Sequence, residues 1–409
     1  MRICIHRGAR QIGGTCIELS HDGVRIALDV GLPLDGDADD AALVPPIAGV
    51  GLAAVLISHP HIDHYGLLHH LPPGIPVAMG SAARRIVEAA APFTGQALPN
   101  LDGPVLRDRE TVEIGPFRIT PHLVDHSAFD AYALLIESDG KRVFYSGDFR
   151  AHGRKGTLFE RMVADPPKDI DVLLMEGSSL SRLCDDECFP SEQALEDKLV
   201  EILTRNDGLA MVHTSAQNID RVVTLFRAAK RTQRTLVIDL YSAAILAATR
   251  HPSIPQSDWS GIALYVPEVQ RRQIKRNGWF DLLKNHSARR IFPEDLGAIA
   301  AKAIVLYRPL LMSDLENSWC LAGARMIYSQ WRGYLEMGSY ATTERWLKQH
   351  GIDIEYLHTS GHASPIDLKR FAQALAPRAL VPIHSFAPDS YSALFANVVA
   401  HADGAWWDV

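Results

Sequence analysis

Four side chains of metal-ligand type crowd into six residues after one apolar run. Residues 53–57 indicate a buried strand, and Ser58 and Pro60 then turn the chain out of it. The four side chains are those of His59, His61, Asp63 and His64. Two imidazoles one residue apart can reach one metal ion from a tight loop, and the following Asp–His pair suits a second ion. Neutral imidazole and carboxylate are ligands that zinc takes, and a catalytic zinc site leaves one position for water. The pattern therefore predicts a metal centre, because merely buried or solvated histidines do not form so dense a cluster.

This loop is similar to the signature loop of metallo-β-lactamase-fold hydrolases. That family adds a histidine in a later loop, here His126 after a strand at 117–121, and an aspartate after another strand, here Asp148 after 142–145. By residue type alone, both are equally well interpreted as ordinary buried polar residues. The resemblance implies the following set: His59, His61 and His126 for one metal, Asp63 and His64 for the other, and Asp148 bridging them.

Asp29 lies at the end of an apolar strand expected over residues 24–30. A carboxylate at such a position is costly to bury alone. Accepting the second N–H of a ligand histidine would satisfy it, whereas a plain turn aspartate is the alternative. An aspartate here carries the first duty in the family that the chain resembles, so we expect Asp29 to hold a ligand histidine.

Two further histidines follow apolar strands near the C-terminus. His362 lies in the run Ser-Gly-His-Ala-Ser at 360–364, and His384 ends a strand at 379–383. These runs resemble the late histidine motifs of the family. By that resemblance, His384 completes the second metal site, and His362 stands beside the leaving group, oriented by Glu176. We also expect a substrate phosphate to be held by the hydroxyls and backbone N–H groups of Ser360, Gly361, His362 and Ser364.

The order of expected elements indicates the fold. Antiparallel strands followed by alternating strands and helices predict an α/β (α+β) protein built on an αββα sandwich. Residues 1–182 and 351–409 are expected to form this metallo-β-lactamase domain. A second alternating strand–helix pattern over residues 183–350 predicts an inserted α/β domain with its own core. Residues 213–221 and 328–333 resemble stretches of the β-CASP domain, an insertion found in nucleic-acid-processing members of the superfamily.

Composition and charge set limits on the setting and the partners. The chain has 409 residues, 47% hydrophobic and 22% charged, with a net charge of −7. Its five scattered cysteines and the absence of a signal-peptide pattern or a long apolar run predict a cytoplasmic protein without a membrane span. Basic residues gather in the insert, at 227–234, 271–276 and 289–290. Each group is either a solvated helix face or a contact for a phosphate backbone.

The resemblance as a whole is to ribonuclease J and its β-CASP relatives. It implies a metal-dependent hydrolase that cleaves single-stranded RNA with two zinc ions, acting 5′-to-3′ from an end, internally, or both. Water would attack phosphorus, and His362 would donate a proton to the departing 3′ oxygen. Manganese is the alternative metal. A DNA nuclease, a hydrolase of small esters and a non-catalytic RNA-binding subunit are the alternative functions. The chain ends about 25 residues after His384, so the oligomeric state stays open between monomer and homodimer.

Overall fold

The computed structural model describes residues 1–47, 51–95, 97–180, 182–184, 186–336 and 338–409. The chain divides into two compact units, the first made of Met1–Phe189 and Gly361–Val409 and the second of Pro190–Ser360. These limits lie seven and ten residues beyond those expected from the sequence. The later limit has a clear cause, because β18 (Ile354–Tyr356) pairs with β17 (Arg325–Tyr328) and so extends the sheet of the second unit.

The first unit is built on two sheets. The first sheet contains, in spatial order, β20 (Trp406–Asp408), β1 (Arg2–Arg7), β2 (Cys16–His21), β3 (Val24–Leu28), β4 (Leu52–Leu56), β5 (Val77–Gly80) and β6 (Val105–Leu106). The second contains β19 (Ala379–Ile383), β11 (Val172–Glu176), β10 (Lys141–Tyr145), β9 (Tyr132–Ser138), β8 (Phe117–Leu123) and β7 (Val112–Ile114). Side chains of both sheets, among them Ile17, Leu134 and Leu174, share one buried core.

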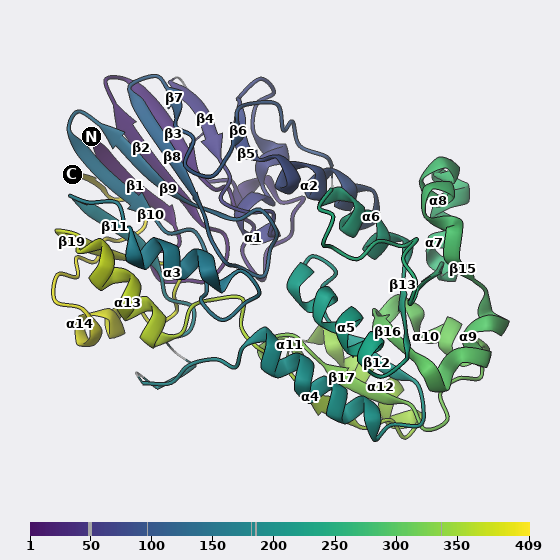
Figure 1. The fold of residues 1–409 in the computed structure, drawn as a ribbon. Coiled ribbons are helices and arrows are strands. Elements are labelled where there is room, and N and C mark those ends of the chain that lie inside the picture. Colours follow the sequence, from purple (N-terminus) through teal and green to yellow (C-terminus); the bar gives the residue numbers. More distant parts are fainter. Residues whose placement is uncertain (48–50, 96, 181, 185, 337) are drawn as a thin grey trace. The chain divides into compact units, whose positions relative to one another are not determined.

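Helices cover the outer faces of these sheets. Helices α1 (Ile62–Tyr65) and α2 (Ser81–Thr94) lie beside the first sheet, where Ala83 and Val87 of α2 join a core with strands β3 to β5. Helices α3 (Gly156–Ala164) and α13 (Pro365–Leu375) cover the second sheet, where they share a core with its outer face. Figure 1 shows these layers, and the expected αββα sandwich is confirmed.

The second sheet of this unit brings three strand ends to one edge. Strand β11 runs parallel to both β10 and β19. The residues that follow these strands therefore meet at the same edge. Asp148 follows β10, Glu176 ends β11 and His384 follows β19. The fold thus gathers three of the expected site residues by strand direction alone.

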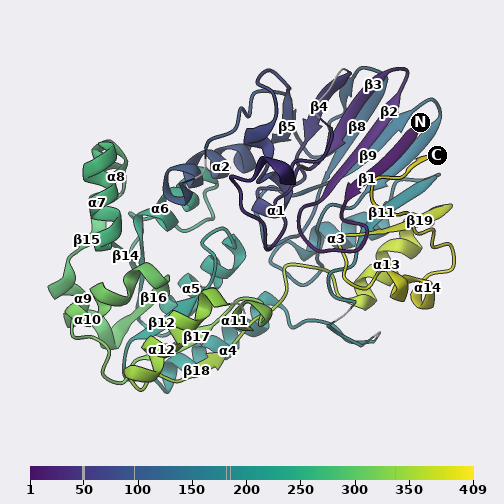
Figure 2. The ribbon, with the colours of Figure 1, turned by 180° about the vertical axis from the view of Figure 1, so that it is seen from behind.

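The second unit is a parallel α/β layer. Its sheet has the order β15 (Arg290–Ile291), β14 (Ile262–Tyr265), β13 (Thr235–Ile238), β16 (Ala303–Tyr307), β12 (Ala210–His213), β17 and β18. Parallel neighbours need crossover connections, which here include α5 (Ile219–Arg231), α6 (Leu240–Ala248), α7 (Glu268–Asn277), α8 (Phe280–His286), α9 (Pro293–Ile299), α10 (Met312–Asn317) and α12 (Ala341–Gln349). Helix α4 (Glu192–Thr204) precedes β12, the first of these strands along the chain. Within this unit, α7 and α8 lie at one end, and α4 and α12 lie at the other (Figures 1 and 2). Among the described residues, no helix is long and apolar enough to cross a membrane.

Candidate metal centre

Three imidazole nitrogens converge where β4 and β8 end. Nδ1 of His61 lies 3.2 Å from Nε2 of His59 and 3.2 Å from Nε2 of His126. His59 and His61 follow β4 of the first sheet, whereas His126 follows β8 of the second. Three ring nitrogens from the two sheets thus face a common point, as the ligands of one cation must.

A second group of ligand-type atoms adjoins the first. Oδ2 of Asp63 lies 3.7 Å from Nε2 of His64 and 3.9 Å from Nε2 of His384. Oδ2 of Asp148 lies 3.2 Å from Nε2 of His64 and 3.6 Å from Nε2 of His384. The same oxygen lies 3.8 Å from Nε2 of His59. Asp148 therefore reaches both groups, which is the position that a bridging carboxylate needs.

The buried polar atoms of the second group test whether a metal fits. Among the described residues, four buried ligand atoms make no hydrogen bond: Nε2 of His64, Nε2 of His384, and both carboxylate oxygens of Asp148. A buried polar atom without a partner costs about 1–3 kcal/mol, so four of them in one place need an explanation. A divalent cation would satisfy all four. The imidazole and carboxylate donors present suit zinc and, as the alternative, manganese.

The electrostatics of the rings agree with cation binding. Burial lowers the pKa of His59 and of His126 well below the ordinary value, so both rings are neutral. Burial also acts to lower the pKa of His64, but the surrounding carboxylates, Asp148 foremost, raise it well above the ordinary value. The negative charge around His64 that raises its pKa would equally favour a cation at this place.

Ser58 and Asp29 orient the rings of the first loop. Nδ1 of His64 lies 2.7 Å from Oδ2 of Asp29. The hydroxyl of Ser58 donates to the same oxygen at 2.8 Å and lies 3.0 Å from Nδ1 of His59. A contact between Asp29 and a ligand histidine was predicted from the sequence. The role of Ser58 was not, because its only signal is its place between the strand and the first histidine. Both contacts leave the Nε2 atoms of the rings facing the centre.

Two more residues orient ligand histidines without having been expected to do so. The hydroxyl of Thr15 lies 2.9 Å from Nδ1 of His384. The carbonyl oxygen of Gly361 lies 2.6 Å from Nδ1 of His126, which donates to it. A Cβ at position 361 would come within 2.6 Å of the Ser127 hydroxyl, so glycine allows this approach. Thr15 carries no sequence signal beyond the two glycines before it, and the carbonyl of Gly361 carries none.

His362 stands beside this cluster on a buried carboxylate. Its Nδ1 lies 3.1 Å from Oε2 of Glu176 and 3.6 Å from Oδ2 of Asp148. Burial alone would lower the pKa of His362, but Glu176 and then Asp148 outweigh it and raise the pKa. Glu176 is fully buried and accepts the backbone N–H groups of Phe149 and Ser178, each at 3.2 Å. His362 is therefore held by its Nδ1 atom on Glu176, beside the metal-ligand cluster.

The residues expected to bind phosphate differ in burial and in the unit to which they belong. Ser364 is fully buried at the N-terminus of α13, where its hydroxyl donates to Oδ2 of Asp367 at 2.7 Å and accepts the Asp367 N–H at 3.3 Å. Gly361 and His362 lie in the first unit, whereas Ser360 is the last residue of the second. The hydroxyl of Ser364 is thus engaged in capping its helix. Phosphate binding by this loop stays a prediction.

A buried ion pair joins two of the ligand-bearing loops. Nε of Arg150 lies 3.4 Å from Oδ1 of Asp125, and both side chains are fully buried. The N–H of Arg150 also donates to the carbonyl of Asp125 at 2.7 Å. Asp125 precedes His126, and Arg150 follows Asp148 by two residues. The pair therefore ties the loop of one expected ligand to the loop of another.

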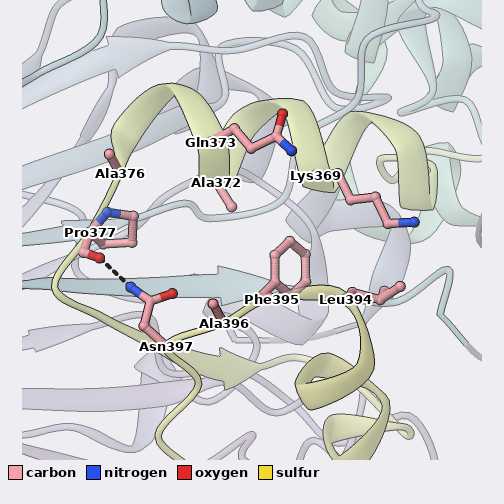
Figure 3. Close-up of a pocket in the computed structure, with 9 residues that line it drawn as sticks. All are labelled: Lys369, Ala372, Gln373, Ala376, Pro377, Leu394, Phe395, Ala396 and Asn397. Carbon is pink, nitrogen blue, oxygen red and sulfur yellow. Dashed lines mark hydrogen bonds between the residues drawn. The ribbon is translucent and has the colours of Figure 1, made fainter.

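A separate cavity of about 510 Å³ lies between α13 and residues 394–397 (Figure 3). It is lined largely by apolar atoms, and Asn397 at its edge donates a hydrogen bond to the carbonyl of Pro377. None of the expected metal ligands lines it. We therefore assign it no part in the chemistry of the centre.

Comparison with known proteins gives one family match. The family described as "Beta-lactamase superfamily domain" matches residues 34–238. This range contains His59, His61, Asp63, His64, His126 and Asp148. The match covers half of the chain, and the late residues His362 and His384 lie outside it.

Individual relatives have low sequence identity to this chain, but their alignments cover most of it. A protein of Sinorhizobium meliloti named "Ribonuclease J" is 23% identical over 86% of this chain, which spans 59% of that protein's length. A protein of Methanocaldococcus jannaschii named "Probable RNase MJ4" is 22% identical over 94% of this chain and 93% of that protein. A crystal structure of a protein of unknown function from Enterococcus faecalis V583 matches with a TM-score of 0.80, at 21% identity, over 99% of each chain. That structural match shows the shared fold.

Proposed function

Because this chain belongs to the beta-lactamase superfamily, we propose that it is a metal-dependent hydrolase that cleaves phosphodiester bonds of single-stranded RNA. One observation carries the proposal. Seven side chains of ligand type meet at one place, and four of their buried atoms lack a hydrogen-bond partner within the described residues. The names of two relatives, "Ribonuclease J" and "Probable RNase MJ4", support RNA as the substrate.

Two zinc ions are the proposed cofactors, with manganese as the alternative. His59, His61 and His126 would hold one ion, Asp63, His64 and His384 the other, and Asp148 both. When bound, the ions would supply Lewis acids that polarise the phosphodiester and acidify the attacking water. Asp29, Ser58 and Thr15 keep the rings oriented so that their free nitrogens point at the centre.

His362 is the proposed general acid. The carboxylates of Glu176 and Asp148 raise the pKa of the ring, which favours its protonated form, and Glu176 fixes the ring by its Nδ1 atom. The ring can then give the proton of its other nitrogen to the departing 3′ oxygen. The backbone N–H groups of the Gly361 loop and the hydroxyl of Ser360 would hold a substrate phosphate.

The wider setting follows from the same family. We propose that the second unit is a β-CASP domain, that the enzyme acts in the cytoplasm on RNA processing or decay, and that it cuts 5′-to-3′ from an end, internally, or both. The chain spans 59% of the length of its Sinorhizobium relative, and its oligomeric state stays open between monomer and homodimer.

A cleavage assay on end-labelled single-stranded RNA tests the proposal. Metal-quantified protein is compared with Asp63→Ala on RNA carrying a 5′ monophosphate, a 5′ triphosphate or a 5′ hydroxyl, with a DNA oligomer of the same sequence alongside. Mononucleotides released only from the monophosphate RNA would mean a 5′ exoribonuclease, and discrete fragments an endonuclease. Two bound metals with cleavage of DNA alone, or of neither polymer, would overturn the proposal.

A further inference from the structure

We propose that residues 268–290 of the second unit form a surface that binds the phosphodiester backbone of single-stranded RNA. This surface, here called the basic hairpin, comprises α7, α8 and the turn that follows α8. The inference rests on the proposed function, since it concerns how the RNA substrate is held. The metal centre belongs to the first unit, so the basic hairpin would be an additional contact for the RNA.

The basic hairpin opposes the charge of the rest of the chain. It carries seven Arg and Lys side chains against two acidic ones, in a protein whose net charge is −7. Such a local excess is the electrostatic footprint of a nucleic-acid contact, because patches rather than net charge govern phosphate binding.

Three of these cations are available to a ligand. The side chains of Lys275, Arg276 and Lys284 are exposed, and within the described residues no ion pair or hydrogen bond engages them. Others are engaged, since Arg271 lies 3.3 Å from Asp314 and Arg272 pairs with Glu268 one turn away. The unengaged cations are therefore the ones that we assign to phosphates.

The helical spacing groups the cations of α7 on one face and places Lys284 of α8 beside an exposed aromatic ring. Lys275 and Arg276 stand three and four residues after Arg272 on α7, and so share a face with it. Phe280 and Lys284 are four residues apart on α8, and Phe280 is 58% exposed. Single-stranded nucleic acid is bound by cations that follow the backbone and by aromatic faces on which bases stack. An exposed ring beside cations favours single-stranded RNA, whose bases can stack on the ring while its phosphates meet the cations.

The basic group on α5 is different. Arg227 lies 2.8 Å from Glu196, and Arg231 lies 3.0 Å from Glu196 and 2.6 Å from Asp197. Arg234, which follows the helix, is buried and donates to backbone carbonyls. Arg227 and Arg231 thus already have acidic partners, so we assign the phosphate contact to the basic hairpin instead. Their partners lie on α4 and in loops, where the sequence could not place them.

A binding experiment can separate the basic hairpin from net charge. The triple variant Lys275→Gln, Arg276→Gln, Lys284→Gln is compared with the control Lys198→Gln, Arg345→Gln, Lys348→Gln. The control removes the same charge from exposed positions on α4 and α12, at the other end of the unit. Both are made with Asp63→Ala so that the RNA is not cut. Fluorescence anisotropy then gives the Kd for a labelled RNA of about 20 nucleotides, a length that covers a typical single-strand site, over a salt series.

Loss of three phosphate contacts should reduce the slope of log Kd against log salt concentration by about 2. At low salt, the Kd should rise by about tenfold or more. The control should bind as the parent does. Phe280→Ala should weaken binding about fivefold or more, because a stacked base is lost. Equal binding by both triple variants would overturn the proposal. A second result would also overturn it: polyglutamate competes as strongly as unlabelled RNA, and Phe280→Ala has no effect on the Kd. That result would indicate an acidic protein partner.

The same variants, with Asp63 restored, distinguish this proposal from the proposed function. On a tetranucleotide, which offers few phosphates beyond the scissile one, the basic-hairpin variant should cleave like wild type, whereas on a long RNA its KM should rise. If wild type cleaves RNA and the variant shows no rise in KM or Kd, the basic hairpin fails and the function stands. If wild type cleaves no RNA yet the variant still loses binding, the function fails and the basic hairpin stands.

Discussion

Oδ2 of Asp29 lies 2.7 Å from Nδ1 of His64, and Nε2 of the same ring lies 3.2 Å from Asp148. Asp29 is fully buried and also accepts the N–H of Ser58 at 2.7 Å. Its φ of 58° is left-handed, a conformation that aspartate tolerates better than most residues. The backbone therefore turns the carboxylate back under the His64 ring. The contact leaves the lone pair of Nε2 directed at the expected metal.

Replacing Asp29 tests whether this contact serves metal binding. In Asp29→Asn the amide accepts more weakly from His64, so the ring loses its fixed orientation and basicity. Metal affinity should fall about 10- to 100-fold, measured by competition with a chromophoric chelator. Asp139→Asn is the matched control, because Asp139 has a φ of 52° in an exposed hairpin turn. Unchanged affinity in Asp29→Asn would mean that the carboxylate serves folding alone.

His362 should be separable from the metal ligands. His362→Ala should keep the metal content and slow hydrolysis about 10²- to 10⁴-fold, because a general acid is removed. Glu176→Gln should slow it less, since the ring remains but loses its anionic partner. Metal analysis and single-turnover rates check both. Loss of metal from His362→Ala would instead make His362 a ligand, as its group with Asp148 and His384 allows.

Much of this centre could be predicted because its residues follow apolar strands. Each such strand is readable from its composition, and β10, β11 and β19 run parallel, so Asp148, Glu176 and His384 meet at one edge. The groups that orient the ligands were harder to find. Thr15 is 369 residues away from His384 along the chain, and the Gly361 carbonyl reaches His126 across 235. Only tertiary packing brings such groups together, and a hydroxyl or a carbonyl has no distinctive pattern.

In the fold, too, the elements were predictable from the sequence but their tertiary partners were not. Strand β18 looked like the return of the first domain, because it leads directly into the loop of His362. It belongs to the sheet of the second unit, because its three residues pair in parallel with Met326 to Tyr328 of β17. The sequence of a short strand does not determine which strand it pairs with. The strand could therefore be predicted, but not the sheet to which it belongs.

The ion pair between Arg150 and Asp125 should contribute strongly to the free energy of unfolding. In Arg150→Met, Asp125 is left as a buried charge without its partner, and the free energy of unfolding should fall by about 3–5 kcal/mol. Urea denaturation of the metal-free protein measures this. Arg370→Met is the control, because Arg370 pairs with Glu160 at the surface, where such pairs contribute about 0–1 kcal/mol. Equal losses in the two variants would contradict the assignment of the buried pair.

His122 should make the metal-free protein acid-sensitive. Burial, and then the charge of Arg109, lowers its pKa from 6.5 to about 4. Between these values the unfolded chain binds a proton that the folded chain does not, so stability rises with pH and is lost as pH falls. The loss from this ring is up to about 1.4 kcal/mol per pH unit, or about 3 kcal/mol in all. His122→Phe should flatten the pH dependence of urea unfolding by that amount, because the variant has no group to protonate. His251→Phe, at an exposed position, should leave it unchanged. An equal slope in wild type and His122→Phe would show that His122 is charged in the folded protein.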